Sequence, residues 1–187
     1  MTFDPEQHRR RSTRAKWHDY GRAGRYFVTI CAFERACLFG AIVDGRMSLS
    51  EAGTVVEWHW HETPQIRPYV TLDGFMIMPN HLHGVVSITP HSPIPGNRAA
   101  DTAPRGTAPG SFGAIIQQFK AITTKRINAD RGLSGVPVWQ RNYYDHVIRD
   151  ADDLERIRAY IAANPSRWLD DEHNPDTHPS VNPMAAM

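Results

Sequence analysis

Residues 69–89 read YVTLDGFMIMPNHLHGVVSIT, two runs rich in β-branched, aromatic and other apolar residues on either side of Pro79-Asn80. Runs of this composition are typical of strands, and the Pro-Asn pair is typical of a tight turn. We therefore expect an antiparallel hairpin with strands at 69–78 and 81–89. The rest of the predicted fold is built outward from this hairpin.

The second predicted strand begins with the triplet His81-Leu82-His83. Side chains alternate between the two faces of a strand, so the two histidines share one face while Leu82 points into the core. Two imidazoles in this arrangement form half of a metal site, whose other positions water and phosphate oxygens can fill. Histidines without any ligand on a sheet surface are the simpler interpretation. His59 and His61 have the same spacing but fall in a predicted helix, where residues two apart do not share a face.

Strands and helices are also predicted on both sides of the hairpin. They are a strand at 25–33, a strand in parts of 37–49 interrupted by the turn signal Asp44-Gly45, a helix capped by Ser50 that stops before Pro64, a helix opened by Ser111, an extended segment at 138–148, and a helix at about 151–163 capped by Asp150. The order β-β-α-β-β-α-β-α predicts an α+β fold, an antiparallel sheet with helices packed on it, related to the ferredoxin-like plan.

The chain of 187 residues suits one domain with a substantial core. We expect a basic N-terminal arm at 1–24, a single domain at 25–165 and a loose C-terminal tail at 166–187. Within the domain, residues 90–110 are dominated by Pro, Gly, Ala, Ser and Thr, which predicts a flexible surface loop.

The composition narrows the class of protein. Apolar residues make up 41% of the chain and charged residues 22%, which is typical of soluble globular proteins. Neither a long apolar run nor a secretory signal is apparent, so we expect no membrane partner and a cytoplasmic location. Cys31 and Cys37 lack CxxC spacing and are expected to be reduced thiols. The net charge of +1 combines an arginine-rich start with an acidic end, and the basic arm suggests a polyanionic partner.

The predicted last helix carries Tyr160 and Asn164, four residues apart and therefore on one face. A tyrosine hydroxyl, with an unperturbed pKa of about 10, must be activated to attack phosphorus at neutral pH. A cation beside the scissile phosphate would favour the phenolate, and the Asn164 amide oxygen could complete its coordination shell. A packed tyrosine and an asparagine C-cap form the simpler interpretation. Tyr144, which shares a predicted strand face with the potential base His146, is a second candidate nucleophile.

Several segments follow one another over most of residues 9–169: YFVTICAFERACLFG, MPNHLHGVV, GAIIQQFKAITTKRIN, VWQRNYYDHVIRD and LERIRAYIAANPSRW. Together they resemble the REP-associated tyrosine transposases, members of the single-strand transposase group of HUH endonucleases. The resemblance implies the HUH nuclease sandwich, with His81 and His83 as metal ligands, Tyr160 as the nucleophile and Asn164 completing the metal site. In the transposon enzymes of the group this last position is more often glutamine. The loop at 90–110 departs from the family motifs.

The resemblance also implies a chemistry. Tyr160 would attack a phosphodiester of single-stranded hairpin DNA in the presence of Mg²⁺ or Mn²⁺, giving a 5′-phosphotyrosine link and a free 3′-OH. The 3′-OH can later rejoin the strands, so no nucleotide cofactor is needed. The side chains expected to contact DNA phosphates are Arg9, Arg10, Arg11, Arg14, Lys120, Lys125, Arg126 and Arg141. Trp139, Arg141 and Tyr143 could stack on unpaired bases, although surface exposure and core packing explain all these residues equally well.

The predicted function is therefore that of a metal-dependent single-strand DNA endonuclease and strand transferase, a transposase. A non-catalytic protein that binds hairpin or single-stranded nucleic acid on the same fold is an alternative. A metal-dependent hydrolase, in which water attacks and Tyr160 is structural, is another. Both a monomer and a homodimer are compatible with the sequence.

Overall fold

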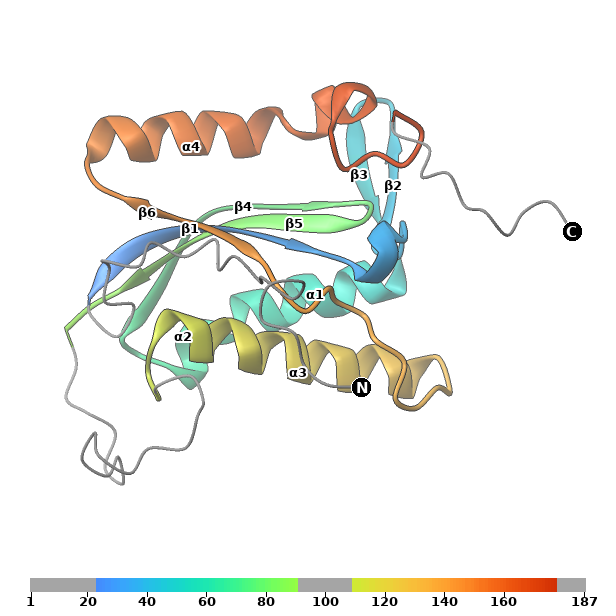
Figure 1. Cartoon of the computed structure of the whole chain (residues 1–187), viewed down its shortest axis with the longest axis horizontal. Helices are drawn as coiled ribbons and strands as arrows, with labels where there is room; N and C mark the ends of the chain where they lie inside the picture. Colours follow the sequence, from blue (N-terminus) through green and yellow to red (C-terminus); the bar gives the residue numbers. More distant parts are fainter. Residues whose placement is uncertain (1–22, 91–108, 178–187) are drawn as a thin grey trace, which may run out of the picture.

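A four-stranded antiparallel sheet organises this computed structural model, which describes residues 23–90 and 109–177 (Figure 1). Its strands are β1 (Gly24–Cys31), β4 (Val70–Met78), β5 (His81–Ile88) and β6 (Tyr144–Ile148), in the order β4-β5-β1-β6. Since every neighbouring pair is antiparallel and helices cover the sheet, the predicted α+β class is confirmed.

The hairpin predicted at residues 69–89 is confirmed. β4 and β5 pair as far as Met78 and His81, so the connecting turn is formed by Pro79 and Asn80. β5 pairs with β1 on its other side and is therefore a central strand. This position gives the residues of β5 a backbone that is hydrogen-bonded on both edges.

A second, two-stranded sheet stands apart from the first. It consists of β2 (Gly40–Val43) and β3 (Arg46–Leu49), joined at Asp44 and Gly45 as the turn signal predicts. Both turn residues have positive φ angles, 51° and 71°. This backbone matches the right-handed twist of a tight hairpin and favours Asp-Gly pairs.

The helices begin where capping side chains predict. They are α1 (Glu51–His61), a short α2 (Thr63–Ile66), α3 (Phe112–Asp130) and α4 (Ala151–Ala163), with 3-10 turns η1 (Phe33–Arg35) and η2 (Pro165–Asp170). Ser50, Ser111 and Asp150 each accept a hydrogen bond from a backbone N–H in the first turn of their helix. Sequence analysis did not predict α2, in which Pro64 occupies the first turn, where its missing N–H costs nothing.

The two faces of the sheet bury different cores. Helices α1 and α3 lie against one face and α4 lies against the other (Figure 1). On β1, Tyr26 and Val28 pack on the side of α1 and α3, while Phe27 packs on the side of α4. On β5, Leu82 belongs to the first core and Val85 to the second. His81 and His83, at the same strand parity as Val85, therefore face α4.

Close packing holds α1 against the sheet at Gly84 of β5. A Cβ atom at this position would lie 2.2 Å from Cζ2 of Trp60, far inside van der Waals contact. Trp60 is buried and stacks on Phe75 of β4, with 5.0 Å between the ring centroids. Only glycine allows this approach of the α1 indole to the strand.

Two segments differ from the sequence-based predictions. The strand within 138–148 is confined to β6, and Trp139 before it forms only an isolated bridge with Ala32. Residues 166–177, expected to lie in a loose tail, continue η2 and form a series of hydrogen-bonded turns. Most of the predicted loop at 90–110 lies outside the described residues. No described helix is both long and apolar enough to cross a membrane.

Candidate active site

The two histidines of β5 point their imidazoles at one another in the space between the sheet and α4. Nε2 of His81 lies 3.1 Å from Nε2 of His83, and the rings meet edge to face. His81 is fully buried and His83 is 1% exposed. The strand thus holds two nitrogen atoms at one point, as the spacing of the pair predicts.

The tautomer of His81 is determined by Asn80. The Asn80 Nδ2 group donates to the backbone oxygens of Arg35, at 3.0 Å, and His173, at 2.7 Å. Its Oδ1 atom is therefore the one that lies 2.9 Å from His81 Nδ1, and that nitrogen must carry the proton. The lone pair of His81 is consequently on Nε2, the atom that faces His83.

His83 has a more adaptable neighbour, the hydroxyl of Thr29 on β1, 2.9 Å from Nδ1. A hydroxyl can donate or accept, so both neutral tautomers of His83 are satisfied. Without a cation, His83 Nε2–H donates to the His81 lone pair. When Thr29 accepts from Nδ1–H instead, both Nε2 lone pairs become free for a metal ion.

Both histidines are neutral at physiological pH. Burial, with the neighbouring His83 and His173 imidazoles, lowers the pKa of His81 to about 2. Burial and His173 lower the pKa of His83 to about 3, against a side-chain hydrogen bond from Asn164 that raises it. Neutral imidazoles with converging lone pairs suit a divalent cation.

Tyr160 of α4 and Asn164, the C-cap of that helix, complete the group. The Tyr160 hydroxyl lies 3.5 Å from His83 Nε2, and its ring meets Phe27 edge to face. Asn164 Nδ2 donates to the Tyr160 backbone oxygen at 2.7 Å, and its side chain also forms hydrogen bonds that raise the pKa of His83 and lower that of Tyr160. The structure thus brings His81, His83, Tyr160 and Asn164 together.

Tyr160 is accessible but not spontaneously ionised. Its side chain is 46% exposed at the edge of the site. Burial of the remainder and the Asp171 carboxylate raise its pKa, which Asn164 partly offsets. The hydroxyl therefore keeps its proton at neutral pH, and attack on phosphorus requires a nearby positive charge.

The second candidate tyrosine also lies near the site. Tyr144 is 51% exposed at the start of β6, and its ring contacts Phe27. His146, the base expected for it, instead bonds Asp153 of α4 through Nε2 at 2.8 Å. Tyr144 thus lies on the same face of the sheet as Tyr160. The histidine expected to act as its base is already hydrogen-bonded to a carboxylate.

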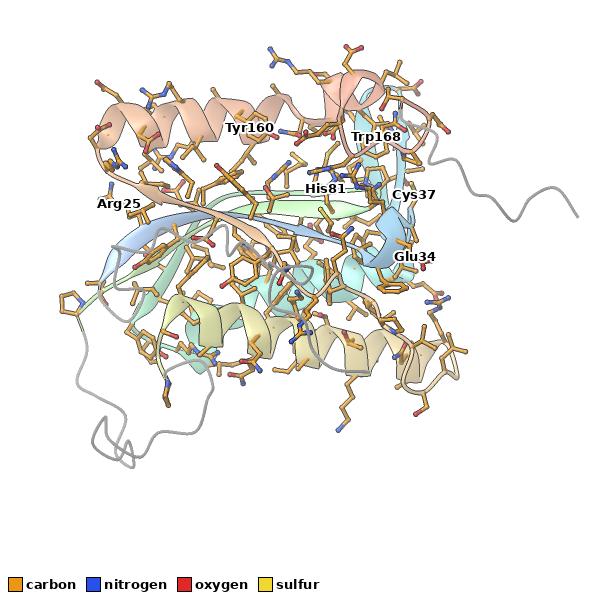
Figure 2. The ribbon with its side chains drawn as sticks, viewed as in Figure 1. Arg25, Glu34, Cys37, His81, Tyr160 and Trp168 are labelled. Carbon is orange, nitrogen blue, oxygen red and sulfur yellow. The ribbon has the colours of Figure 1, made fainter. Side chains whose placement is uncertain are left out.

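Sequence analysis missed the turn that follows η2. Asp171 Oδ2 approaches within 3.9 Å of His81 Nε2, and the His173 ring meets the His81 ring with 4.7 Å between centroids. Figure 2 shows Trp168, in η2, close to His81 and on the same side of the sheet as Tyr160. No motif marks these residues, because only the tertiary fold returns the chain from α4 to the β4–β5 turn.

The basic side chains expected to bind DNA lie elsewhere. Lys120, Lys125 and Arg126 belong to α3, which covers the opposite face of the sheet from Tyr160 (Figure 1). Lys120 donates to the backbone oxygens of Gln140 and Arg141, and burial lowers its pKa to about 8. Its ammonium group thus holds the segment before β6 in place.

A groove of about 940 Å³ runs between α3 and residues 133–143. Lys125 and Arg141 line it with exposed side chains, whereas Arg126 pairs with Asp130. Trp139, expected to stack on bases, is 6% exposed and donates to Thr123 in the core, so that expectation was wrong.

The remaining arginines of the predicted DNA surface, Arg9, Arg10, Arg11 and Arg14, lie outside the described residues. Among the described residues, His, Cys, Asp and Glu side chains form no complete cluster of three or more that could hold a metal ion. The candidate donor set is therefore the two histidines with an amide, Asn164, rather than a preformed cluster of such residues.

Comparison with known proteins places this chain in a family and a fold. No family model matches the chain. An uncharacterized protein of Haemophilus influenzae is 39% identical over 170 residues, which cover 88% of this chain and 93% of that protein. The chain belongs to the same family as this Haemophilus protein.

The fold has a solved counterpart. A REP-associated tyrosine transposase bound to a REP hairpin matches with a TM-score of 0.52 and 17% identity, over 82% of this chain and 74% of that one. The chain therefore has the fold of that transposase, and the predicted fold is confirmed.

Proposed function

We propose that this protein is a metal-dependent single-strand DNA endonuclease and strand transferase with Tyr160 as its nucleophile. The observation that carries the proposal is the placement of the Tyr160 hydroxyl 3.5 Å from His83 Nε2, beside two neutral histidines whose Nε2 atoms are 3.1 Å apart. A nucleophile next to converging metal ligands is the arrangement that phosphodiester transfer needs. The fold of a tyrosine transposase supports this choice.

His81, His83 and the Asn164 amide oxygen would hold Mg²⁺ or Mn²⁺. When bound, the cation supplies positive charge that draws electrons from the scissile phosphorus and favours the phenolate. The chain contributes the positions of its donor atoms. Asn80 and Thr29 orient the two imidazoles, and the hydrogen bond to the Tyr160 backbone oxygen orients the Asn164 amide.

The transfer step exchanges one phosphorus–oxygen bond for another. Tyr160 Oη bonds to phosphorus, the bond to the 3′ oxygen of the preceding nucleotide breaks, and that oxygen leaves as a 3′-OH. The half-exposed hydroxyl can release its proton to water. Because the phosphotyrosine preserves the bond energy, attack by a 3′-OH reverses the step and joins strands without a nucleotide cofactor.

The proposed substrate is single-stranded DNA beside a hairpin. The structural neighbour binds a REP hairpin, which suggests a similar ligand for this chain. The groove lined by Lys125 and Arg141 offers cationic side chains for a phosphate backbone. Its position across the sheet from Tyr160 suits DNA that wraps around the edge formed by β6.

The test is covalent adduct formation. Hairpin oligonucleotides with single-stranded flanks, labelled at the 3′ end, are incubated with protein and Mn²⁺ and run on a denaturing gel. A labelled band at the mass of protein plus DNA, absent for Tyr160→Phe and present for Tyr144→Phe, is expected. Cleavage without an adduct would instead identify a hydrolase, and binding without cleavage a non-catalytic DNA-binding protein.

A further inference from the structure

We infer that Asp171, in the turn after η2, is a further ligand of the cation proposed at His81 and His83. This inference rests on the proposed function and adds a carboxylate to its two imidazoles and amide. It assigns a role to a segment that follows the nucleophile-bearing helix.

The geometry of Asp171 directs one oxygen at the site. Oδ1 accepts a hydrogen bond from the His173 backbone N–H at 2.7 Å, which fixes the rotamer. Oδ2 then lies 3.9 Å from His81 Nε2, and the Asp171 side chain is only 9% exposed. Within residues 23–90 and 109–177, no hydrogen bond is directed at Oδ2.

This contact is unfavourable without a cation. Asn80 places the proton of His81 on Nδ1, so Nε2 presents a lone pair to the carboxylate. An anionic oxygen and a nitrogen lone pair that face each other in a buried site repel one another. A positive ion between them would replace this repulsion with two favourable contacts.

The spacing of the donor atoms agrees with this interpretation. Ligands about 2.1 Å from an octahedral cation lie about 3 Å apart when adjacent and about 4 Å apart when opposite. The separation of 3.1 Å between the two Nε2 atoms fits adjacent ligands. Asp171 Oδ2, 3.9 Å from His81 Nε2, lies beyond the spacing of adjacent ligands. Since the described side chains do not form a complete cluster, a small movement of Asp171 would accompany ion binding.

Hydrogen bonds from Asn80 and Arg35 hold the turn that contains Asp171. Asn80 donates to the His173 backbone oxygen at 2.7 Å, and Arg35 donates to that of Glu172 at 2.8 Å. The Asn80 amide thus orients the His81 imidazole and also holds the turn that carries the Asp171 carboxylate.

The chemistry of the ion favours an added carboxylate. Mg²⁺ and Mn²⁺ prefer oxygen ligands, whereas two imidazoles and an amide make a neutral, nitrogen-rich site. Asp171 supplies an anionic oxygen.

The experiment measures Mn²⁺ binding to the full chain without DNA, by calorimetry and by the electron paramagnetic resonance signal of free Mn²⁺. The proteins are wild type, Asp171→Asn, Glu172→Gln and His83→Ala. Asn keeps an Oδ1 acceptor for the His173 N–H, so the turn is retained. Glu172→Gln removes the same charge from an adjacent side chain that is 82% exposed.

The inference predicts that Asp171→Asn weakens Mn²⁺ binding about tenfold or more, while Glu172→Gln changes it by less than about twofold. Normal binding by Asp171→Asn with loss in His83→Ala would overturn the inference and leave the proposed function standing. If wild type binds no Mn²⁺ and forms no DNA adduct, both fail. Unchanged thermal unfolding of each variant shows that the fold is intact.

Discussion

The Tyr160 hydroxyl lies 3.5 Å from His83 Nε2, although the two residues are 77 positions apart in the chain. This contact joins the helix that carries the proposed nucleophile to the strand that carries the proposed metal ligands. The ring of Phe27 supports it by contacting both partners, at 6.0 Å from the Tyr160 centroid and 5.6 Å from that of His83. Ring packing thereby holds the hydroxyl at the outer limit of hydrogen-bonding distance from His83 Nε2.

Removing the hydroxyl tests the role of Tyr160. Tyr160→Phe keeps the ring contacts with Phe27 and His83 and should leave stability nearly unchanged. Strand cleavage should fall by roughly 10³-fold or more, because the attacking atom is gone. Rates are measured with 5′-labelled hairpin DNA, and wild-type cleavage by the variant would contradict the assignment. Tyr144→Phe is the matched control and should retain most of the activity.

Asn80 should control metal affinity without contacting the metal. Asn80→Ala removes the acceptor that fixes the His81 tautomer, and Mn²⁺ affinity should fall about 10-fold to 100-fold. Asn80→Asp keeps the acceptor for His81 but loses the hydrogen bonds donated to the backbone oxygens of Arg35 and His173. Its Mn²⁺ affinity should therefore report how much the anchoring of the C-terminal turn contributes. Calorimetric titration with Mn²⁺ measures both; equal affinity of all three proteins would exclude this role.

The buried histidines predict a pH dependence of stability. Folded His81 and His83 have pKa values of about 2 and 3, well below the unfolded value of about 6.5. Between these pH values the unfolded chain binds more protons than the folded chain. The contribution of the two neutral histidines to the free energy of unfolding is therefore fully present above about pH 6.5 and is lost as the pH falls. Each histidine contributes up to about 1.4 kcal/mol per pH unit.

Urea unfolding at pH 7 and pH 5 measures this effect. His83→Gln should show a smaller loss of unfolding free energy between the two pH values than wild type. An identical loss in both proteins would show that His83 is not the group that takes up protons. Burial also lowers the pKa of His59 on α1, but this residue is only partly buried, so His59→Gln should reduce the loss less than His83→Gln does.

Packing at Gly84 predicts a large loss of stability. Gly84→Ala places a methyl group against the Trp60 indole and should lower the free energy of unfolding by about 1–3 kcal/mol. Gly74→Ala, whose Cβ would lie 3.3 Å from Ile161 Cδ1, should cost less. Chemical denaturation measures both, and equal effects would argue against close packing of α1 on β5.

Two lysines of α3 should behave differently. Lys120→Met breaks hydrogen bonds to the Gln140 and Arg141 backbone oxygens and should destabilise the fold by about 1–3 kcal/mol. Lys125→Met should leave stability unchanged, weaken DNA binding and reduce its salt dependence by about 0.7 in the log–log slope. A Lys125→Met protein with an unchanged slope would remove the groove from the DNA interface.

Local signals predicted most of the fold. The hairpin at 69–89, the capping residues Ser50, Ser111 and Asp150, and the Asp-Gly turn depend on neighbours in the chain, and each was confirmed. The prediction that His81 and His83 share a face needed only strand alternation. Their proximity to Tyr160 was expected only from the family resemblance, because no local sequence pattern predicts a contact between β5 and α4.

Tertiary contacts account for what sequence analysis missed. Trp139 precedes a segment of polar and aromatic residues, yet it is buried because it packs against Phe119 of α3 and Thr123 accepts its N–H. Asp171 and His173 lie in an acidic stretch typical of an exposed tail. Backbone carbonyls that bond Asn80 and Arg35 bring this stretch to the histidines, and such contacts leave no pattern in the sequence.

Peptide mapping of the DNA adduct tests the central claim most directly. After reaction with hairpin DNA and Mn²⁺, nuclease and trypsin digestion should leave Tyr160 in the peptide 159–167 and Tyr144 in the separate peptide 142–149. The account predicts a nucleotide phosphate on Tyr160, found by mass spectrometry in 159–167 alone. Modification of 142–149 instead, or cleaved DNA with neither peptide modified, would contradict it.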